Sequence, residues 1–324
     1  MNLHQLKFVR EAVRQKFSLT AAAEALHTSQ PGVSKAIIEL EQELGVEIFQ
    51  RHGKRIKDLT EPGREVYRSV ERVMLEIDNL KRIGSEFAAR TSGHLRVAIT
   101  HTQARYALPR VVQPFKQQFP DVHLSLLQGT PDQIAHMVLQ GEADVAIATE
   151  AIADYKELVA LPCYTWDHVV IVPKGHELER TVKAANIERE LTIELVARYP
   201  IITYDNAFAG RKKIDEAFAR RQIVPDLVLA AVDADVIKTY VELGMGIGII
   251  ANMAFDPKRD TAFTALPAGH LFGTHTTKLA LKPGVFLRSY VYTFIEMFAP
   301  TLNRSLIDKA LVVEKANTKN DYDL

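Results

Sequence analysis

Residues 18–59 read SLTAAAEALHTSQPGVSKAIIELEQELGVEIFQRHGKRIKDL, and this stretch decides the fold of the N-terminal region. Ser18 can cap a short helix whose run of alanines permits close approach of a neighbouring helix. Thr28 or Ser29 can cap the next helix, in which Pro31 is tolerated because it falls in the first turn. The stretch therefore predicts two helices joined by a tight turn.

The second of these helices has an apolar face and a polar beginning. Its apolar residues recur at helical spacing and are Val33, Ile37, Leu40 and Leu44. Gly45 suits the end of the helix. A brief apolar strand follows, and then RHGKRIK at residues 51–57, a basic turn without an acidic residue.

With an amphipathic helix before them, these elements follow the plan of a winged helix-turn-helix, which we expect over residues 1–59. A helix fits the major groove of DNA, where base edges carry a distinguishable pattern of donors and acceptors. From the helix we expect DNA contacts by Ser29, Gln30, Pro31, Ser34 and Lys35. From the basic wing we expect contacts to phosphates or the minor groove by Arg51, Lys54 and Arg55. The alternative is a helical cap with a solvated charged loop.

Residues 60–90 predict one long linker helix, with Thr60 as its N-cap. Its apolar positions step by alternate fours and threes and are Val66, Val70, Val73, Ile77, Leu80, Gly84 and Phe87. Such a stripe could pack on its own domain, but a strict 3.5-residue period favours a partner helix in a twofold dimer.

Composition restricts the class of protein. The chain has 324 residues, of which 47% are hydrophobic and 25% charged, with a net charge of zero. No apolar run approaches the roughly 20 residues that span a bilayer, and the charged first helix is not a secretory signal. We expect a cytoplasmic protein without a membrane segment.

Catalytic and metal signatures are missing from the sequence. Cys163 is the only cysteine, which excludes an internal disulfide and a multi-cysteine zinc site. The glycines at 244, 246 and 248 do not match the dinucleotide fingerprint, and the 11 histidines contain no HExxH pair. We therefore expect no catalytic residue, no bound metal, no cofactor and no enzymatic activity.

From Leu95 onward, short β-like runs alternate with helical ones, which indicates an α/β region. Three of these runs end in threonine, at Thr100, Thr149 and Thr203. Thr102 and Gln103 follow the first of them, where a strand leads into a helix and free N–H groups can bind an anion. These residues could converge on one crevice that binds a small polar anion, or they could be simple strand-end caps.

The chain resembles the LysR-type transcriptional regulators, on the run AAAEALHTSQPGVSKAIIELEQELGVEIFQR at residues 21–51. It is most similar to their CysB/Cbl subgroup, on the runs THTQARYALP (100–109), DVAIATEA (144–151), LPCYTW (161–166), DADVIKTYVELGMGIGIIA (233–251) and FLRSYVYTFIEMFAP (286–300). This resemblance implies regulation of genes for sulfur assimilation and cysteine biosynthesis. The alternatives are a LysR-type regulator of another sulfur-source pathway, such as sulfonate use, and a cytoplasmic small-anion-binding protein.

The resemblance also implies an architecture: an α/β protein with a winged helix-turn-helix, a linker helix and a two-lobed, periplasmic-binding-protein-like effector domain over residues 91–301. We expect lobe I at about 91–163 and 268–301, lobe II at about 164–267, and a C-terminal tail at 302–324, frayed from Glu314. Double-stranded promoter DNA and further copies of the chain, as a dimer of dimers, are the implied partners. RNA polymerase is a further partner that the resemblance allows.

By the same resemblance, the effector is sulfate, thiosulfate, O-acetylserine or N-acetylserine, bound between the lobes. The implied effector-binding residues are Thr100, Thr102, Gln103, Thr149 and Thr203, with Gln103 contributing mainly its backbone N–H. The run YDNAFAGR at 204–211 departs from the subgroup and places Asp205 near the expected site. A carboxylate facing the cleft would weaken anion binding.

Overall fold

A computed structural model describes residues 1–53, 55–88, 91–184, 191–207 and 209–320. The chain forms two compact units, Met1–Ala88 and Ala89–Leu324, and each is described by itself. Within the described residues, no helix combines the length and the apolar character that crossing a membrane requires.

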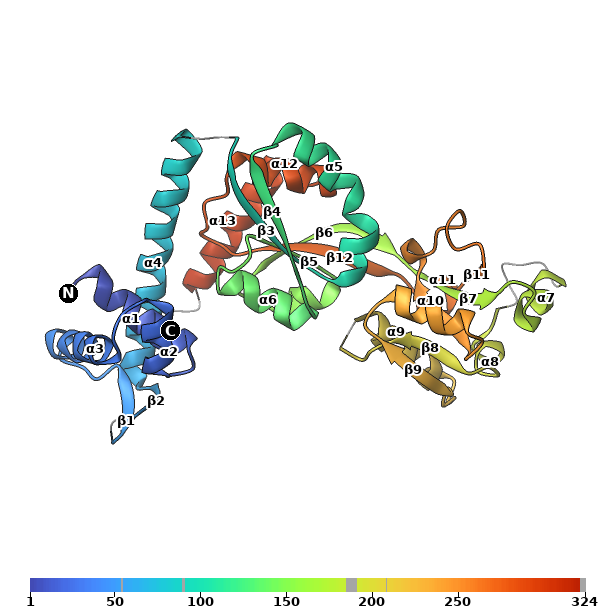
Figure 1. Cartoon of the computed structure of the whole chain (residues 1–324), viewed down its shortest axis with the longest axis horizontal. Helices are drawn as coiled ribbons and strands as arrows, with labels where there is room; N and C mark the ends of the chain where they lie inside the picture. The colour runs from blue at the N-terminus through green and yellow to red at the C-terminus, as the bar shows by residue number, and fades with distance from the viewer. Residues whose placement is uncertain (54, 89–90, 185–190, 208, 321–324) are drawn as a thin grey trace. The chain divides into compact units, whose positions relative to one another are not determined.

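The first unit has the architecture that the sequence predicts (Figure 1). Its elements are α1 (Leu3–Arg14), α2 (Leu19–Ala25), α3 (Gln30–Leu44), β1 (Phe49–His52), β2 (Arg55–Leu59) and α4 (Glu61–Ala88). Ser18 caps α2, and α3 ends at Gly45 with a φ of 71°, a left-handed conformation that glycine adopts without a steric penalty. Strands β1 and β2 pair as an antiparallel hairpin, which is the wing.

Helix α4 has two apolar faces rather than one continuous seam. Val70 and Met74 are buried in the core of the first unit, and Val66 and Ile77 pack partly against it. The residues that face outward are spaced by seven and are Val73 (43% exposed), Leu80 (68%) and Phe87 (73%). The stripe that the sequence predicts is therefore divided: one part closes the unit's own core, and the other part stays exposed.

The second unit contains two five-stranded sheets (Figure 1). Lobe I has strand order β4-β3-β5-β12-β6, and its strands are β3 (Gly93–Ile99), β4 (Val122–Gln128), β5 (Val145–Ala148), β6 (Val159–Trp166) and β12 (His275–Leu281). Lobe II has the order β11-β7-β10-β8-β9, and its strands are β7 (His168–Pro173), β8 (Ile201–Tyr204), β9 (Leu227–Ala231), β10 (Ile247–Ala251) and β11 (Phe263–Pro267). The pairs among β3, β4 and β5 and among β8, β9 and β10 are parallel.

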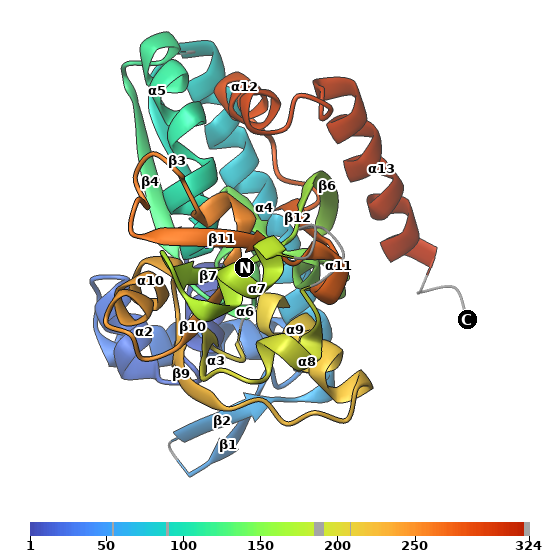
Figure 2. The ribbon, with the colours of Figure 1, turned by 90° about the vertical axis from the view of Figure 1, so that its right-hand side faces the viewer.

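Helices cover both sheets. Lobe I has η1 (Gln103–Ala107, a π-helix), α5 (Pro109–Gln118), α6 (Pro131–Leu139), η2 (Glu150–Asp154), α12 (Ser289–Phe298) and α13 (Arg304–Asn320). Lobe II has α7 (Glu177–Ala184), α8 (Ile193–Val196), α9 (Ala209–Arg220), α10 (Ala234–Glu242), η3 (Asn252–Ala254) and α11 (Gly269–Phe272). Helix α13 contacts β6 and continues to Asn320, so the expected fraying from Glu314 is wrong up to that residue (Figure 2).

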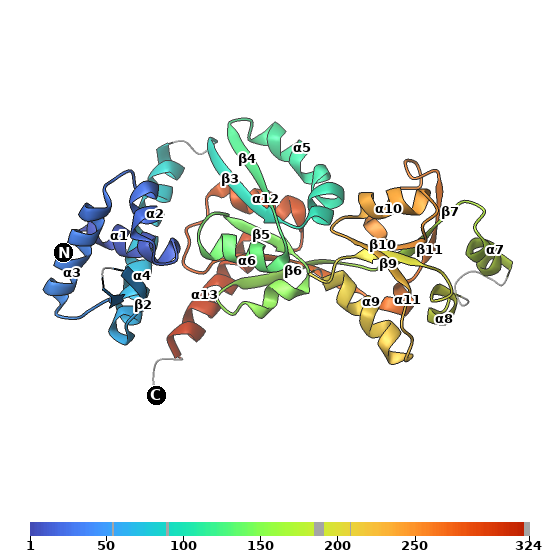
Figure 3. The same ribbon diagram turned by 60° about the horizontal axis from the view of Figure 1, so that its bottom comes forward.

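The chain passes between the lobes twice. It leaves lobe I where β6 leads into β7 (Figure 3), at Asp167, and it returns through the segment between α11 and β12. Tyr164 and Thr165 pair with β12 in lobe I, whereas Phe272 belongs to the core of lobe II. The crossings therefore lie a few residues beyond the lobe bounds expected at 163 and 268, because β6 runs on to Trp166 and α11 still packs on the core of lobe II.

Shortening a side chain on each of the two faces of α4 should change the stability of the first unit by different amounts. We expect Met74→Ala to lower the unfolding free energy of the first unit by about 2–5 kcal/mol, because it leaves a cavity in a packed core. Leu80→Ala is the matched control, and we expect it to change that free energy by about 0.5 kcal/mol or less, as exposed substitutions do. Denaturant unfolding of dilute protein measures both. Equal losses in the two variants would show that the faces are assigned wrongly.

Candidate functional site

The start of α3 and the wing form one polar surface. Gln30, Pro31, Ser34, Lys35 and Arg51 line the same hollow, and Gln30 and Arg55 border a second hollow beside it. Ser29 instead caps the helix, since its Oγ accepts a hydrogen bond from the Gly32 N–H at 3.3 Å. Lys54, which the sequence also predicts at this surface, lies outside the described residues.

A buried carboxylate fixes the wing to α3. Glu41 Oε1 accepts hydrogen bonds from the N–H groups of Ile48 (2.9 Å) and Phe49 (3.1 Å). Its second oxygen, Oε2, accepts from the Arg51 guanidinium at 2.8 Å. Arg51 therefore holds the wing in place, whereas Arg55 is exposed and makes no ion pair within 4 Å among the described residues.

A second site is a small cavity between the lobes of the second unit, at the ends of several strands. Its lining residues are Thr100, Thr102, Gln103, Pro131, Thr149, Trp166, Tyr204, Gly210 and Ala251. The volume open to water-sized molecules is about 30 Å³. This volume counts only the positions that the centre of a water-sized molecule can take, so the cavity is larger than one water and suits a small ligand.

Two buried hydrogen-bond donors in the wall of this cavity have no acceptor in the part of the chain that the structure describes. The Thr149 hydroxyl belongs to a residue that is 8% exposed, and the Trp166 indole N–H to one that is 7% exposed. Neither has a hydrogen-bond partner within the described part of the chain. Leaving a buried donor unpaired costs about 1–3 kcal/mol, so a ligand that offers acceptor oxygens would recover that cost.

The first turn after β3 adds further donors. Gln103 uses its side chain elsewhere: its amide nitrogen donates to Thr277 Oγ1 at 3.0 Å, and its amide oxygen accepts from the Tyr164 hydroxyl. Its backbone N–H lies in the first turn of a helical segment, where N–H groups have no acceptor within the helix. The expectation that Gln103 offers mainly its backbone fits this geometry.

Two residues lie differently from what the sequence suggests. The Thr203 hydroxyl donates to the Ile249 carbonyl at 2.9 Å and is absent from the cavity wall, where Tyr204 takes its place. Successive residues of a strand face opposite sides of its sheet, which accounts for the exchange. Asp205 is also absent from the wall: its side chain accepts from the Ala207 N–H at 3.0 Å, within its own turn.

Sequence reasoning missed five residues of the cavity wall: Pro131, Trp166, Tyr204, Gly210 and Ala251. Tyr204 and Ala251 end β8 and β10, so strand-end position was the signal that could have found them. Gly210 carried no signal. A Cβ there would lie 3.3 Å from His168 Nε2 and 3.6 Å from the Trp166 ring, tight enough to disturb this side of the cavity.

Behind Trp166, three rings pack together where the chain crosses between the lobes. The Trp166 and His275 rings stack with centroids 4.4 Å apart, and His168 lies 4.9 Å from His275 and 5.3 Å from Trp166. His275 Nδ1 lies 2.9 Å from Glu150 Oε1, and Lys213 Nζ lies 3.2 Å from the same oxygen. Burial alone would raise the pKa of Glu150, but the His275 contact and backbone hydrogen bonds outweigh it and lower the pKa to about 2.

His168 is fully buried, and neither ring nitrogen has a hydrogen-bond partner among the described residues. Burial lowers the pKa of His168 to about 3, with a smaller contribution from His275. The unfolded chain binds a proton at His168 below pH about 6.5, whereas the folded chain does not until about pH 3. Stability contributed by neutral His168 is therefore lost progressively as the pH falls from 6.5 toward 3.

The lowered pKa of His168 predicts that stability depends on pH. When the pH falls from 7 to 5, we expect His168 to lower the unfolding free energy of the wild type by about 2 kcal/mol. His168→Phe removes the titrating ring and should lose correspondingly less over the same interval. His52→Gln, which changes an exposed histidine of the wing, is the control and should follow the wild type. Parallel pH curves for His168→Phe and the wild type in denaturant unfolding would contradict the assignment.

A DNA-reading winged helix-turn-helix joined to a two-lobed domain with a small inter-lobe cavity defines a ligand-sensing transcriptional regulator. Two family models match the chain: "Bacterial regulatory helix-turn-helix protein, lysR family" over residues 3–64 and "LysR substrate binding domain" over residues 88–303. The chain belongs to the LysR family of transcriptional regulators.

Similarity to individual relatives shows to which subgroup of the family this chain belongs. The chain is 61% identical to the transcriptional regulator CysB of Burkholderia cenocepacia over 312 residues, which cover 96% of this chain and 97% of that one. It is 58% identical to SsuR of the same organism over 308 residues, which cover 95% and 97%. The cofactor-binding domain of the Cbl regulator superposes with a TM-score of 0.63 at 42% identity, covering 68% of this chain and 94% of that domain. The chain thus falls in the CysB/Cbl subgroup.

Proposed function

We propose that this protein is a homo-oligomeric regulator that binds promoter DNA and controls genes of sulfur assimilation and cysteine biosynthesis in response to a small effector. The observation that carries the sensing role is the cavity whose Thr149 and Trp166 donors find no acceptor among the described residues. Similarity to CysB and Cbl supports the sulfur context. We infer a cytoplasmic protein without catalytic activity, since the regulators it resembles act on DNA.

The effector that we propose is a small oxyanion or an acetylated serine: sulfate, thiosulfate, O-acetylserine or N-acetylserine. Hydroxyl, indole and backbone N–H donors in the wall suit oxygen acceptors, and no carboxylate lines the cavity in the described chain. We propose Thr100, Thr102, Thr149 and the Gln103 N–H as direct contacts. Thr203 is a supporting residue in this arrangement, because its hydroxyl already serves Ile249.

For DNA we propose that α3 enters the major groove and the wing contacts the backbone. Gln30 and Ser34 face outward at the start of α3 and can read base edges, and Lys35 can reach a base or a phosphate. Arg55, with Lys54 beside it in the sequence, supplies positive charge from the wing. Ser29 and Pro31 shape the beginning of the helix.

Oligomerisation is the part of the proposal that rests on α4. Val73, Leu80 and Phe87 recur every seven residues on the outward face, which is the spacing of a coiled-coil seam. We propose that this face pairs two copies, and that two such pairs form the dimer of dimers. RNA polymerase is a further partner of the DNA-bound assembly in this proposal.

A second candidate function has one specific observation in its favour. The relative named SsuR is nearly as similar to this chain as the relative named CysB. A regulator of another sulfur source, such as sulfonates, would use the same fold and cavity. Gel shifts with DNA upstream of cysteine-biosynthesis genes and upstream of sulfonate-use genes, each with and without acetylserines, decide between them. Indifference to both fragments at low salt would overturn the DNA-binding proposal.

The wing assignment predicts a change in salt dependence. We expect Arg55→Ala to weaken binding to all DNA sequences and to reduce the slope of log K against log salt by about one unit, as for one lost phosphate contact. Arg72→Ala, which removes a cation from α4 in the same unit, is the control and should leave the slope unchanged. Fluorescence anisotropy across a salt series measures both, and an unchanged slope for Arg55→Ala would contradict the assignment.

The cavity assignment predicts that two threonine substitutions have different effects on effector affinity. Thr149→Val removes an unpartnered donor from the wall, and we expect it to weaken sulfate binding by about tenfold, the equivalent of a typical net hydrogen bond. Thr203→Val is the matched control: it should lower stability through the lost bond to Ile249 and leave sulfate affinity closer to the wild type. Calorimetric titration of the full-length proteins measures both affinities. DNA binding without effector should persist in Thr149→Val, and its loss would indicate misfolding.

A further inference from the structure

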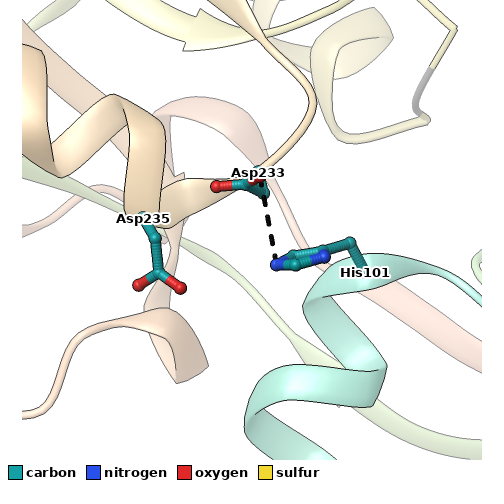
Figure 4. Close-up of side chains that lie close together, drawn as sticks. All are labelled: His101, Asp233 and Asp235. Carbon is teal, nitrogen blue, oxygen red and sulfur yellow. Dashed lines mark ion pairs between the residues drawn. The ribbon is translucent and has the colours of Figure 1, made fainter.

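Outside the cavity, one segment of lobe I reaches across to lobe II. Residues 101–106 run from the end of β3 into η1, and they face the first turn of α10 at Asp233 and Asp235. Figure 4 shows His101 on its helical turn pointing toward Asp233, with Asp235 on the next part of α10. The lobes thus meet at a second place, separate from the two crossings of the chain.

Asp235 receives both of the close contacts. The Tyr106 hydroxyl donates to Asp235 Oδ1 at 2.6 Å, and the Arg105 Nε donates to Oδ2 at 3.1 Å. His101 Nε2 lies 4.0 Å from Asp233 Oδ2, a longer and weaker approach. Both oxygens of Asp235 are therefore used by groups from the other lobe.

Tyr106 does more than donate a hydrogen bond. Its ring packs against the lobe II core cluster that contains Tyr204, Ala234 and Ile237. Lys238 of α10 lies over the same ring, 5.3 Å from its centroid. A side chain from lobe I is thus inserted into the apolar surface of lobe II, and its hydroxyl is fixed by Asp235.

The same segment carries part of the cavity wall. Thr102 and Gln103 line the cavity, and Arg105 and Tyr106 follow them within one turn. Any movement of lobe I away from Asp235 carries Thr102 and Gln103 away from Tyr204 and Ala251 on the opposite wall. Closure at Asp235 and assembly of the cavity are therefore one motion.

We propose that Asp235 is a positioning residue for effector binding, which holds the Arg105–Tyr106 segment against lobe II and so keeps the cavity in its closed, binding-competent form. Asp235 does not line the cavity and would not touch the effector. This inference rests on the proposed effector role of the cavity. Since apparent affinity is scaled by the population of the competent form, removing the contact weakens binding without removing a ligand contact.

A bound cation is the rival use of these side chains, because His101, Asp233 and Asp235 place one ligand atom each within 4.8 Å of one another. The geometry favours the contact between lobes. The Asp235 oxygens already accept from Tyr106 and Arg105, and a guanidinium 3.1 Å away repels a cation. Asp233 is also committed, since its Oδ1 caps α10 at the Val236 N–H.

The test is a double-mutant cycle in the full-length protein, with sulfate as the probe in calorimetric titration. We expect Tyr106→Phe and Asp235→Ala each to raise the sulfate Kd by about three- to tenfold, as a partly depopulated closed form requires. The double variant should bind no more weakly than Asp235→Ala, because that change already removes the acceptor of the Tyr106 hydroxyl. Glu216→Gln, which removes an exposed lobe II carboxylate paired with Arg220, is the control and should keep the wild-type Kd.

The cycle separates this role from simple destabilisation of α10. Loss of an acidic residue from the first turn of a helix acts through the helix dipole and is independent of Tyr106, so its effect would multiply with that of Tyr106→Phe. Multiplying effects, or a wild-type Kd in Asp235→Ala, would overturn the positioning role while the effector proposal stands. Zinc binding by the wild type that Asp235→Ala abolishes would also overturn it in favour of a metal site. A wild type that binds neither sulfate nor an acetylserine would overturn the effector proposal itself.

Discussion

The geometry of the second unit depends on the packing of three rings where the chain passes between its two sheets. Trp166 ends the outgoing strand, His168 begins the next one, and His275 begins the returning strand. Because Trp166 stacks on His275 and His168 packs edge-on against both, the rings link the two crossings to each other. This fixes which strand ends face each other, and the cavity is the space that remains between those ends. This packing has a cost in free energy, because the ring nitrogens of His168 are buried without hydrogen-bond partners in the described chain.

The first unit is small, and a domain of this size buries little apolar surface in a core of its own. It uses one face of α4 to complete that core, through Val70 and Met74, and leaves the neighbouring stripe of Val73, Leu80 and Phe87 exposed. The wing is anchored in a different way: Glu41 of α3 accepts hydrogen bonds from the backbone at the start of the first wing strand. The surface that we propose to face DNA is therefore built from elements that are each anchored to a neighbour.

Much of this could be predicted from the sequence, because the decisive signals are local. Helix caps, the glycine at the end of α3 and the basic turn specify the winged helix-turn-helix, and strand ends specify Thr100 and Thr149. The remainder depends on tertiary contacts that no spacing reveals. The sequence of α4 does not show whether an apolar side chain packs in its own domain or against another chain. Thr203 and Tyr204 are adjacent, and only the sheet decides which of them faces the cavity.

The length of α4 has a mechanical consequence. Its 28 residues form an unbroken helix, which at 1.5 Å per residue makes a rod of about 42 Å. Such a rod acts as a lever arm: a tilt of about 5° at one end displaces the other by roughly 4 Å, comparable with the rise of one base pair, about 3.4 Å. A small tilt at Ala88 would thus be enlarged into a displacement of a few ångströms at Glu61, the end joined to the wing.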